Sequence, residues 1–427
     1  MTYQELPRSE AVLEFEKVKK EYEQLCEKGL SLDLSRGKPG KEQLDMVSPI
    51  LRALEDTDEF ISEIGLDVRN YGGLDGIPEM KRIFADLFGL PEKNIIIGGN
   101  SSLNLMYDTI TRAMMFGVPG SVRPWRKQEK IKFLAPSPGY DRHFIVCETL
   151  GVELIPVNMT PTGPDMDQVE ALVSVDESIK GIWCIPKYSN PDGYTYSDET
   201  VDRLANMHTA APDFRIFWDN AYGVHDFDQN DHDELKDIFS ACKEAGNENR
   251  ILYFASTSKM TFPGAGVAMM AMWDDNLKQA KKLLGAQTIG FDKVNQLRHV
   301  RFFKNAANVH QLMEKHAQIL RPRFELVMKK LAEGLGGTGC ADWTKPKGGY
   351  FVSLYTMDGC AENVYQLCKT AGVKLTEAGG AFPYGHNPRD NHLRLAPTYP
   401  SLSDLSDALD CLVLCVKYAC LNKILNG

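Results

Sequence analysis

The sequence lacks any hydrophobic run that approaches the ~18 residues needed for a membrane span. Its first residues, MTYQELPRSEAVLEFEKVKKEYEQL, are charged from the first turn and contain no apolar stretch of the kind found in a secretory signal. These two absences argue against membrane association and against secretion. We therefore expect a cytoplasmic protein.

The ten cysteines lack a CxxC pair, and no Cys/His spacing suits a zinc site. Cys411 and Cys415 lie four residues apart in the apolar C-terminal segment DALDCLVLCVKYACL. We expect the cysteines to be buried, reduced thiols that pack as small hydrophobic residues. The sequence predicts neither a disulfide framework nor a metal site.

An excess of positive charge is also lacking, because the formal net charge is −10. Such a chain is poorly suited to bind nucleic acid or anionic membranes nonspecifically. The hydrophobic fraction of 43% and the charged fraction of 25% are ordinary for a globular protein. A length of 427 residues exceeds what one hydrophobic core usually serves, so we expect a large domain and a smaller one.

Short apolar runs alternate with helical patterns from about residue 75 to residue 275. Buried runs separated by helical connections favour an α/β fold with a mostly parallel, seven-stranded sheet covered by helices on both faces. The seven runs are IIIGG (95–99), IKFLAP (131–136), VELIPV (152–157), GIWCIP (181–186), RIFWD (215–219), ILYFAS (251–256) and VAMMAM (267–272).

The pattern changes to long helices from Val294 to about Leu335, with a break predicted at Pro322 because proline lacks an amide hydrogen and its ring clashes with the preceding turn. The remaining sequence, which includes GGYFVSLY and HLRLAP before a C-terminal helix, predicts a smaller α/β unit. We therefore predict a large domain over residues 61–305 and a small domain over residues 306–427, to which the N-terminal segment 1–60 also belongs.

Five of the runs are followed closely by polar or aromatic side chains. In open α/β sheets ligands bind at the carboxyl ends of the strands, so we expect these side chains to share one rim. They are Ser101 and Ser102, Tyr140, Asn190, Asp219, and Ser256 with Lys259.

One chemistry uses these groups together. Lys259 can form an imine with an aldehyde cofactor if its surroundings raise the fraction of free amine. Pyridoxal phosphate needs a carboxylate beside its protonated ring nitrogen, and Asp219 can supply it. Tyr222 and Asn190 can hydrogen-bond the ring oxygen, and Tyr140 can stack on the ring. The segment GGNSS, opening a helix, can receive the phosphate with help from Ser256.

The motifs GGNSSL, PGYDRH, NPDG, DNAY, STSK, KGGYF and LRLAP occur in an order and spacing that resemble those of class I and II aminotransferases, which are pyridoxal-phosphate enzymes of fold type I. The resemblance covers nearly the whole chain and is nearest to the class Ic aspartate aminotransferases. It implies that Lys259 holds the cofactor and shuttles a proton, and that Asp219 pairs with the ring nitrogen. It also implies phosphate contacts from Asn100, Ser101, Ser102, Ser256 and Ser258.

The same resemblance implies the substrate contacts and the assembly. Arg394 would bind the α-carboxylate of an amino acid or 2-oxo acid, and Gly37 in SRGKPG belongs to a segment that closes over the substrate. Tyr71 in NYGGLDG would reach the phosphate of the neighbouring subunit. We therefore expect a homodimer with shared active sites.

The sequence departs from the family at two positions. Members usually carry an arginine seven or eight residues after the Schiff-base lysine, where this chain has Gly266 and Val267. We expect helix-end amides and four hydroxyl or amide side chains to meet the phosphate charge instead, with Lys187 or Arg69 as candidate cations. The usual NPTG is NPDG here, which keeps the asparagine and the turn glycine.

Aspartate with 2-oxoglutarate is the predicted substrate pair. The second carboxylate of such a substrate needs its own cation, ideally an arginine fork. The candidates are Arg36 and Lys38, which flank Gly37, and Arg298 or Arg301, which could reach across a dimer.

Other functions fit parts of this pattern. Each residue taken singly has an ordinary structural explanation, such as a turn, a helix cap or a solvated lysine. Decarboxylases, β-lyases and racemases use the same constellation, so the sequence leaves them open. Regulators of the MocR type add a winged-helix domain to this fold, but only about 30 residues precede LDLSRGKPG, and they show no turn-helix pattern. We therefore expect no nucleic-acid partner.

Overall fold

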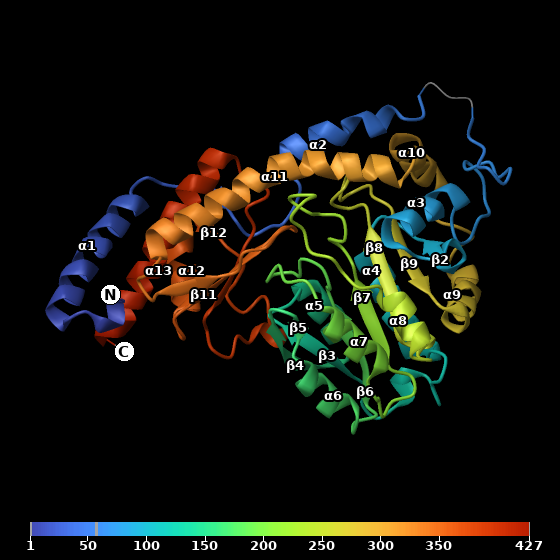
Figure 1. Cartoon of the computed structure of the whole chain (residues 1–427), viewed down its shortest axis with the longest axis horizontal. Coiled ribbons are helices and arrows are strands. Elements are labelled where there is room, and N and C mark those ends of the chain that lie inside the picture. The colour runs from blue at the N-terminus through green and yellow to red at the C-terminus, as the bar shows by residue number, and fades with distance from the viewer. Residues whose placement is uncertain (1, 56–58, 427) are drawn as a thin grey trace.

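A computed structural model describes residues 2–55 and 59–426 (Figure 1). Its main sheet has eight strands in the order β2-β9-β8-β7-β6-β3-β4-β5. The strands are β2 (Ile95–Ile97), β3 (Lys132–Ser137), β4 (Glu153–Thr160), β5 (Gly163–Pro164), β6 (Ile179–Cys184), β7 (Arg215–Asp219), β8 (Ile251–Ser256) and β9 (Ala268–Met272).

The predicted mostly parallel α/β sheet is confirmed. The pairs from β4 through β3, β6 and β7 to β8 are parallel, and β9 runs antiparallel to both of its neighbours. Each of the seven predicted runs contains a strand. The two-residue β5, which pairs antiparallel with the end of β4, is the addition.

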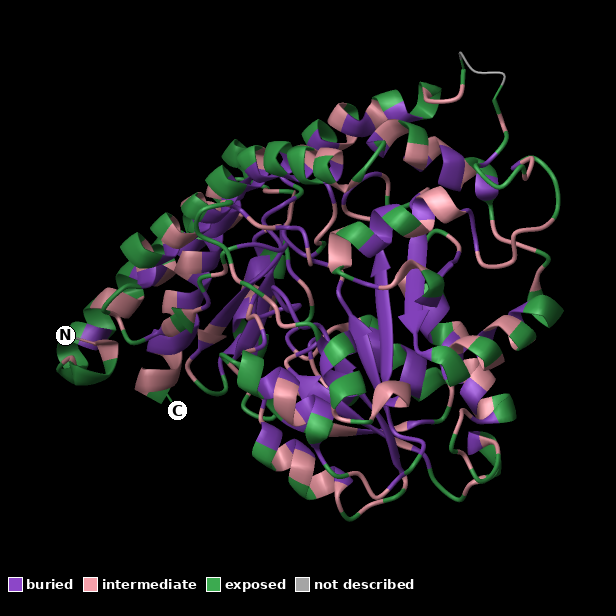
Figure 2. Cartoon of the chain, turned by 45° about the vertical axis from the view of Figure 1, so that its right-hand side comes forward, coloured by how far each residue is buried: buried purple, intermediate pink, exposed green. Residues whose placement is uncertain are grey.

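The central strands β6, β7, β8 and β9 are buried on both faces, which explains why their sequences are apolar runs rather than alternating ones (Figure 2). Ile216 and Trp218 of β7 join one hydrophobic cluster, and Phe217 between them joins the other. The other strands and the surrounding helices supply further members of both clusters. These helices are α3 (Pro78–Phe88), α4 (Ser102–Phe116), α5 (Asp141–Thr149), α6 (Met166–Val173), α7 (Asp198–Asn206), α8 (Ile238–Glu244), α9 (Asp274–Gln287) and α10 (Lys293–Phe303).

A second, smaller body is built from both ends of the chain. The antiparallel sheet β10-β11-β13 and the parallel pair β1-β12 pack with helices around a third hydrophobic cluster. Its elements are α1 (Arg8–Cys26), β1 (Leu32–Asp33), β10 (Ala341–Trp343), β11 (Val352–Thr356), α12 (Ala361–Thr370), β12 (Val373–Lys374), β13 (His392–Leu395) and α13 (Leu402–Asn426). The short helix α2 (Lys41–Val47) lies against the long helix that spans residues 306–335. The domain ranges 1–60, 61–305 and 306–427 stay a prediction.

Short 3-10 helices complete the described elements. They are η1 (Tyr3–Glu5), η2 (Ser48–Arg52), η3 (Glu92–Asn94), η4 (Trp125–Lys127), η5 (Glu248–Arg250) and η6 (Pro383–Gly385).

The long helix α11 (Ala306–Leu335) connects the two bodies (Figure 1). The predicted break at Pro322 is wrong, because the helix continues through this residue. Leu320 and Phe324 on either side of it are buried in the third cluster, and this packing offsets the one hydrogen bond that proline cannot make. The chain breaks instead at Lys304, whose φ of 65° ends α10.

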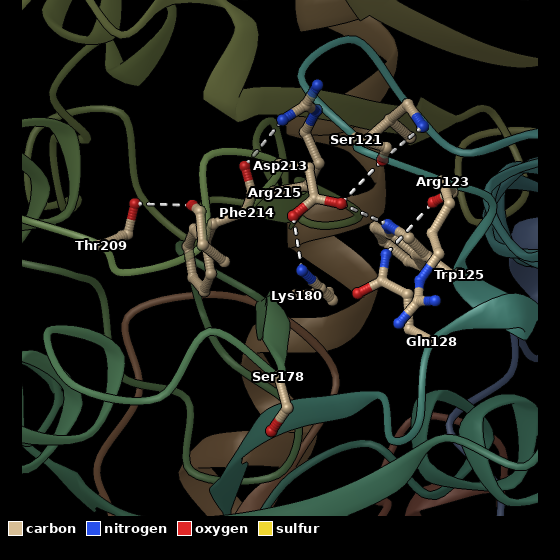
Figure 3. Close-up of polar contacts among 12 residues, drawn as sticks. Ser121, Arg123, Trp125, Gln128, Ser178, Lys180, Thr209, Asp213, Phe214 and Arg215 are labelled. Atoms are coloured by element: carbon tan, nitrogen blue, oxygen red, sulfur yellow. Dashed lines mark hydrogen bonds and ion pairs between the residues drawn. The ribbon is translucent and has the colours of Figure 1, made fainter.

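A buried ion-pair network lies at the amino ends of the central strands (Figure 3). Asp213, just before β7, accepts hydrogen bonds from Lys180 Nζ at 2.7 Å, Ser121 Oγ at 2.7 Å and Trp125 Nε1 at 2.9 Å. Arg215 lies beside it and donates to the carbonyls of Phe214 and Pro119 and to Asn276 Oδ1. Every charged group in this network has a hydrogen-bond partner, as burial requires.

The expected burial of the cysteines is confirmed, but Cys368, Cys411 and Cys415 lie with their sulfur atoms within 4.8 Å of one another, a grouping that could hold a metal ion. All ten cysteines fall in the described part of the chain as free thiols, and nine of them are buried. Cys411 and Cys415 lie within the third hydrophobic cluster with their sulfur atoms 3.9 Å apart. No helix in the described ranges has the length and apolar character required to cross a membrane.

Candidate active site

A cavity of about 510 Å³ opens where the carboxyl ends of the central strands meet the smaller body. All five groups that were predicted to share one rim line it. The predicted residues in its walls are Gly37, Ser101, Ser102, Tyr140, Asn190, Asp219, Tyr222, Ser256, Ser258, Lys259 and Arg394. The structure thus brings together residues that are separated by more than 350 positions in the chain.

Lys259 lies three residues beyond the end of β8, on the cavity wall. Burial lowers the pKa of its amine, and Asp219 acts in the opposite direction. Its Nζ lies 5.2 Å from the centre of the Tyr222 ring and 5.7 Å from that of Tyr350. A buried lysine with a lowered pKa has a larger fraction of free amine, which is the form that attacks an aldehyde.

Asp219 closes β7 and is almost fully buried. Its Oδ2 lies 3.1 Å from His143 Nε2, while its Oδ1 has no hydrogen-bond partner among the described residues. A buried carboxylate oxygen without a partner is costly unless a ligand supplies the donor. The protonated ring nitrogen of pyridoxal phosphate is a donor of the required kind.

His143 was not among the predicted site residues. Its ring stacks on Trp183, with ring centres 4.2 Å apart and an angle of 11°, and this packing fixes its orientation toward Asp219. The signal was present, because PGYDRH begins α5 and places His143 on the turn that follows Tyr140.

Tyr140 and Tyr222 approach the cavity from two strand ends. Tyr140 contacts His143 edge to face, and burial raises its pKa to about 12. Tyr222 is buried, which raises its pKa well above the usual value, and nearby Tyr140 and Asp219 add to the effect. Both phenols therefore stay protonated at neutral pH and can donate a hydrogen bond.

Arg394 extends from β13 of the smaller body into the cavity. It donates to Asn190 Oδ1 at 3.3 Å and to Thr376 Oγ1 at 3.1 Å, and Asp141 Oδ1 lies 3.4 Å from its Nη1. Its guanidinium lies 5.0 Å from the centre of the Phe351 ring. The buried Nε has no partner in the described structure, so the arginine keeps a donor for a carboxylate.

The amino end of α4 forms the opposite part of the cavity. Ser101 is the N-cap residue of this 15-residue helix, yet its side chain makes no capping hydrogen bond. Ser256 Oγ donates to Ser258 Oγ at 3.0 Å beside it. Open amides at a helix start, next to several hydroxyl groups, suit a phosphate.

Two predicted residues do not line the cavity. Asn100 lies outside the cavity lining. Its side-chain amide nitrogen donates to Gly264 O, and its backbone carbonyl accepts from Ser258 Oγ. Tyr71 lies on the surface of this chain, and 76% of it is exposed. A role for Tyr71 in the site therefore requires a second subunit, as its prediction assumed.

The chain is closely packed at both positions where the family carries an arginine, since Gly266 is crowded by its neighbours and Val267 is buried. A Cβ atom at Gly266 would lie 3.1 Å from Thr257 Oγ1 and 3.4 Å from the Asn100 carbonyl oxygen, so the backbone leaves little room for a side chain. The two candidate cations do not face the cavity of this chain. Lys187 pairs with Asp226 at 2.7 Å, and Arg69 pairs with Asp67 at 2.7 Å.

Of the four candidates for binding a second carboxylate, only Arg36 lines the cavity. Lys38 packs over Tyr399, 3.7 Å from the ring centre. Arg298 donates to Asn295 Oδ1, and Arg301 pairs with Glu59 at 3.3 Å.

Arg142, which the sequence analysis did not consider, also lines the cavity. Its Nε lies 3.9 Å from Asp141 Oδ2, too far for a hydrogen bond. The guanidinium of Arg142 is therefore available to bind a carboxylate of a ligand.

Comparison with known proteins agrees with this geometry. Residues 6–427 match the family model described as aspartate amino-transferase. An aspartate aminotransferase of Corynebacterium glutamicum is 45% identical over 411 residues, which cover 96% of this chain and 94% of that protein.

Solved structures show the same fold. The crystal structure of an aspartate transaminase from Corynebacterium glutamicum superposes with a TM-score of 0.97 at 44% identity, covering 99% of both chains. The α-aminoadipate aminotransferase LysN of Thermus thermophilus, complexed with N-(5'-phosphopyridoxyl)-L-leucine, has a TM-score of 0.73 at 20% identity and covers 93% of this chain and 95% of its own. This chain therefore belongs to the aspartate aminotransferase family and is an aminotransferase of fold type I.

Proposed function

We propose that this enzyme holds pyridoxal phosphate through Lys259 and transfers the amino group of aspartate to 2-oxoglutarate. The observation that carries the proposal is the meeting of three groups in one cavity: a buried lysine, a carboxylate with an unpaired oxygen and an arginine with an unpaired nitrogen. These are the groups that an aldehyde cofactor and an α-amino acid require.

When bound, pyridoxal phosphate supplies the electron sink that stabilises the charge left at Cα after deprotonation. Asp219, oriented by His143, would keep the ring nitrogen protonated through its free Oδ1. Asn190 and Tyr222 would hydrogen-bond the ring oxygen and Tyr140 would stack on the ring, while the start of α4 with Ser256 and Ser258 would bind the phosphate.

Lys259 has two roles in this proposal. Its amine would hold the cofactor aldehyde, and as a free amine it would accept the Cα proton of the substrate. The lowered pKa of the amine favours this role as a base at neutral pH. Arg394 binds the α-carboxylate and thereby leaves the Cα–H bond facing the lysine, which favours transamination over decarboxylation.

The second carboxylate of aspartate would be met by Arg36 and Arg142. Both line the cavity, whereas Lys38 packs over a ring, Arg298 donates to Asn295 and Arg301 pairs with Glu59. Arg36 and Arg142 are exposed, so each should contribute modestly, and selection for the second carboxylate rests on their combined charge.

The assembly in this proposal is a homodimer. Tyr71 is exposed, and Ile64 and Ile289 are also largely exposed apolar residues. Burial of such side chains against a second copy would be favourable. In that arrangement Tyr71 would reach the phosphate of the partner's site.

A spectral half-reaction tests the function. L-Aspartate added to the cofactor-loaded enzyme should convert the visible absorbance to that of pyridoxamine phosphate, and 2-oxoglutarate should restore it. We expect kcat/KM for aspartate to exceed that for alanine, leucine or phenylalanine by at least roughly a hundredfold, equivalent to ~2.7 kcal/mol. Equal values for alanine would contradict aspartate specificity, and release of CO₂ or loss of a β-substituent would point to another reaction class.

A further inference from the structure

A polar cluster lies directly behind Lys259, and the proposed chemistry does not use it. It consists of Gln43 in α2, His316 in α11 and Tyr350 before β11, and we call it the Gln43 cluster. Gln43 and Tyr350 have no exposed surface, and only 1% of His316 is exposed. Polar groups buried to this degree specify one arrangement, because each lost hydrogen bond leaves a costly unpaired atom.

The hydrogen bonds of Gln43 fix the direction of every bond in the cluster. The amide nitrogen of Gly40 can only donate, and it lies 3.2 Å from Gln43 Oε1. The amide nitrogen of Gln43 must then face the other side, where His316 Nδ1 lies at 2.8 Å and the hydroxyl of Tyr350 at 3.0 Å. One side chain thus uses its acceptor and both of its donors.

This direction leaves the hydroxyl proton of Tyr350 free to point at the lysine backbone. Tyr350 accepts from Gln43, and its oxygen lies 3.5 Å from the carbonyl oxygen of Lys259. His316 accepts at Nδ1, and burial lowers its pKa to about 4, so it is neutral at pH 7. The ring of Tyr350 also lies 5.7 Å from Lys259 Nζ.

The same glutamine holds the segment that borders the cavity mouth. Its bond to Gly40 fixes the end of the segment 36–40, in which Arg36 and Gly37 line the cavity. Gly37 packs on the ring of Phe351, since a Cβ atom there would lie 2.2 Å from Phe351 Cζ. Residues 350 and 351 therefore support the lysine and the mouth segment together.

We propose that Gln43 is a positioning residue that couples the segment 36–40 to Lys259 through Tyr350. This coupling rests on the proposed function, because it joins the segment that binds substrate to the lysine that carries the proton. Displacement of the segment would release Tyr350 from Gln43, and Tyr350 would then no longer hold the Lys259 carbonyl. The substrate would bind to a site in which the lysine is aligned only when the mouth segment is in place.

Gln43 is also the third residue of α2, where its side chain caps the helix start, so the test must separate capping from coupling. Gln43→Glu keeps an acceptor for Gly40, and glutamate is a good capping residue at this position. It has no donor for Tyr350, which would turn its proton toward the new carboxylate. Tyr350→Phe removes the contact with Lys259 and the bond that Tyr350 accepts from Gln43, but keeps the bond between Gln43 and Gly40. Gln43→Leu removes all three bonds of Gln43. Asn94→Leu is the matched control, because Asn94 is a fully buried amide that donates to Met272 O outside the cavity.

Hydrogen exchange is measured on the cofactor-free protein, and kcat, KM and the pH titration of the visible absorbance on the loaded enzyme. Gln43→Leu should speed exchange in residues 36–40 at least about tenfold and raise KM, since the segment loses its anchor. Gln43→Glu and Tyr350→Phe should leave that exchange near the wild-type rate but lower kcat about tenfold and shift the titration. Asn94→Leu should reduce thermal stability alone.

The proposal is overturned if Gln43→Glu and Tyr350→Phe keep the wild-type kcat and titration. It is also overturned if the exchange of residues 36–40 in Gln43→Leu matches that in Asn94→Leu, because Gln43 would then serve only as a helix cap. If Gln43→Leu does not fold, the other two variants decide the outcome. A wild-type enzyme without transaminase activity would refute the proposed function, whereas the exchange result on the cofactor-free protein would stand by itself.

Discussion

The two ends of strand β7 bury charged groups in different ways. At its amino end Asp213 accepts three hydrogen bonds, and Arg215 donates through each of its nitrogens. At its carboxyl end Asp219 keeps one oxygen without a partner, and Arg394 across the cavity keeps one nitrogen without a partner. Asp213 and Asp219 flank the same buried strand, so burial alone does not explain the difference.

The difference separates buried charges that stabilise the fold from buried charges that are available to bind a ligand. A charge network that satisfies itself holds the structure together and has no capacity left for another molecule. A buried polar atom without a hydrogen-bond partner lowers the stability of the fold, and a ligand that supplies the partner offsets this loss. The comparison predicts that substitutions at the two ends separate stability from activity.

The largest expected effect is at the carboxyl end. Lys259→Ala should lower kcat by at least about ten-thousandfold, or more than ~5 kcal/mol, because the amine that holds the cofactor and the base that carries the proton are lost together. Circular dichroism and the melting temperature should stay close to those of the wild type. Near-normal transamination by this variant would exclude Lys259 from the chemistry.

At the amino end the expected loss is in stability. Lys180→Met leaves Asp213 as a buried charge without its cation, and we expect the free energy of unfolding to fall by about 3–5 kcal/mol. Urea denaturation measures this quantity, and kcat per folded molecule should be unchanged. A large fall in kcat without a fall in stability would reverse the contrast between the two ends.

Asp219→Asn should affect the step that the ring nitrogen controls. The amide cannot keep that nitrogen protonated, so deprotonation of the substrate should slow at least about a hundredfold, or ~2.7 kcal/mol. Single-turnover absorbance with aspartate measures the rate, and cofactor binding should persist. Unchanged single-turnover rates would show that the free oxygen of Asp219 has another purpose.

The stability difference at Asp213 should depend on pH. Burial raises the pKa of Asp213, but hydrogen bonds from Lys180 and Ser121 outweigh it, so the net pKa is lowered. In the native protein the carboxylate therefore stabilises the fold above the unfolded pKa, and this contribution is lost as the pH falls through the folded pKa. Without Lys180 the burial effect dominates, so the deficit of Lys180→Met should shrink on acidification from pH 7 to pH 4, by up to about 1.4 kcal/mol per pH unit. Urea denaturation across this range measures the deficit. A deficit that does not change with pH would contradict the prediction, because Asp213 would then have the same pKa in the variant and in the wild type.

The smallest effect is expected at the cavity mouth. Arg142→Ala should lower kcat/KM for aspartate about tenfold and leave that for alanine nearly unchanged, because an exposed arginine contributes about 1.4 kcal/mol or less to a carboxylate. Arg126, an exposed arginine outside the cavity, provides the control substitution. Equal losses for both substrates would assign Arg142 to positioning of Arg394 through Asp141 instead.

The sequence by itself determined the sheet and the groups at its rim. Buried strands between helices must be continuous apolar runs, and a polar residue that follows such a run must lie at the strand end. For this reason Asp219 and Lys259 could be assigned to one cavity before any coordinates were known. The continuation of α11 through Pro322 could not be predicted, because tertiary packing on both sides of the proline outweighs its local preference to end a helix.

Only the tertiary structure decided which polar groups outside the rim approach the cavity. His143 faces Asp219 because its ring stacks on Trp183, and no local pattern encodes that contact. Arg142 rather than Lys38 lines the cavity because side-chain direction depends on the packing of each element. Gln43 meets His316 and Tyr350 across 273 and 307 positions of sequence. A hydrogen bond acts over about 3 Å, so such contacts exist only once the whole chain has folded.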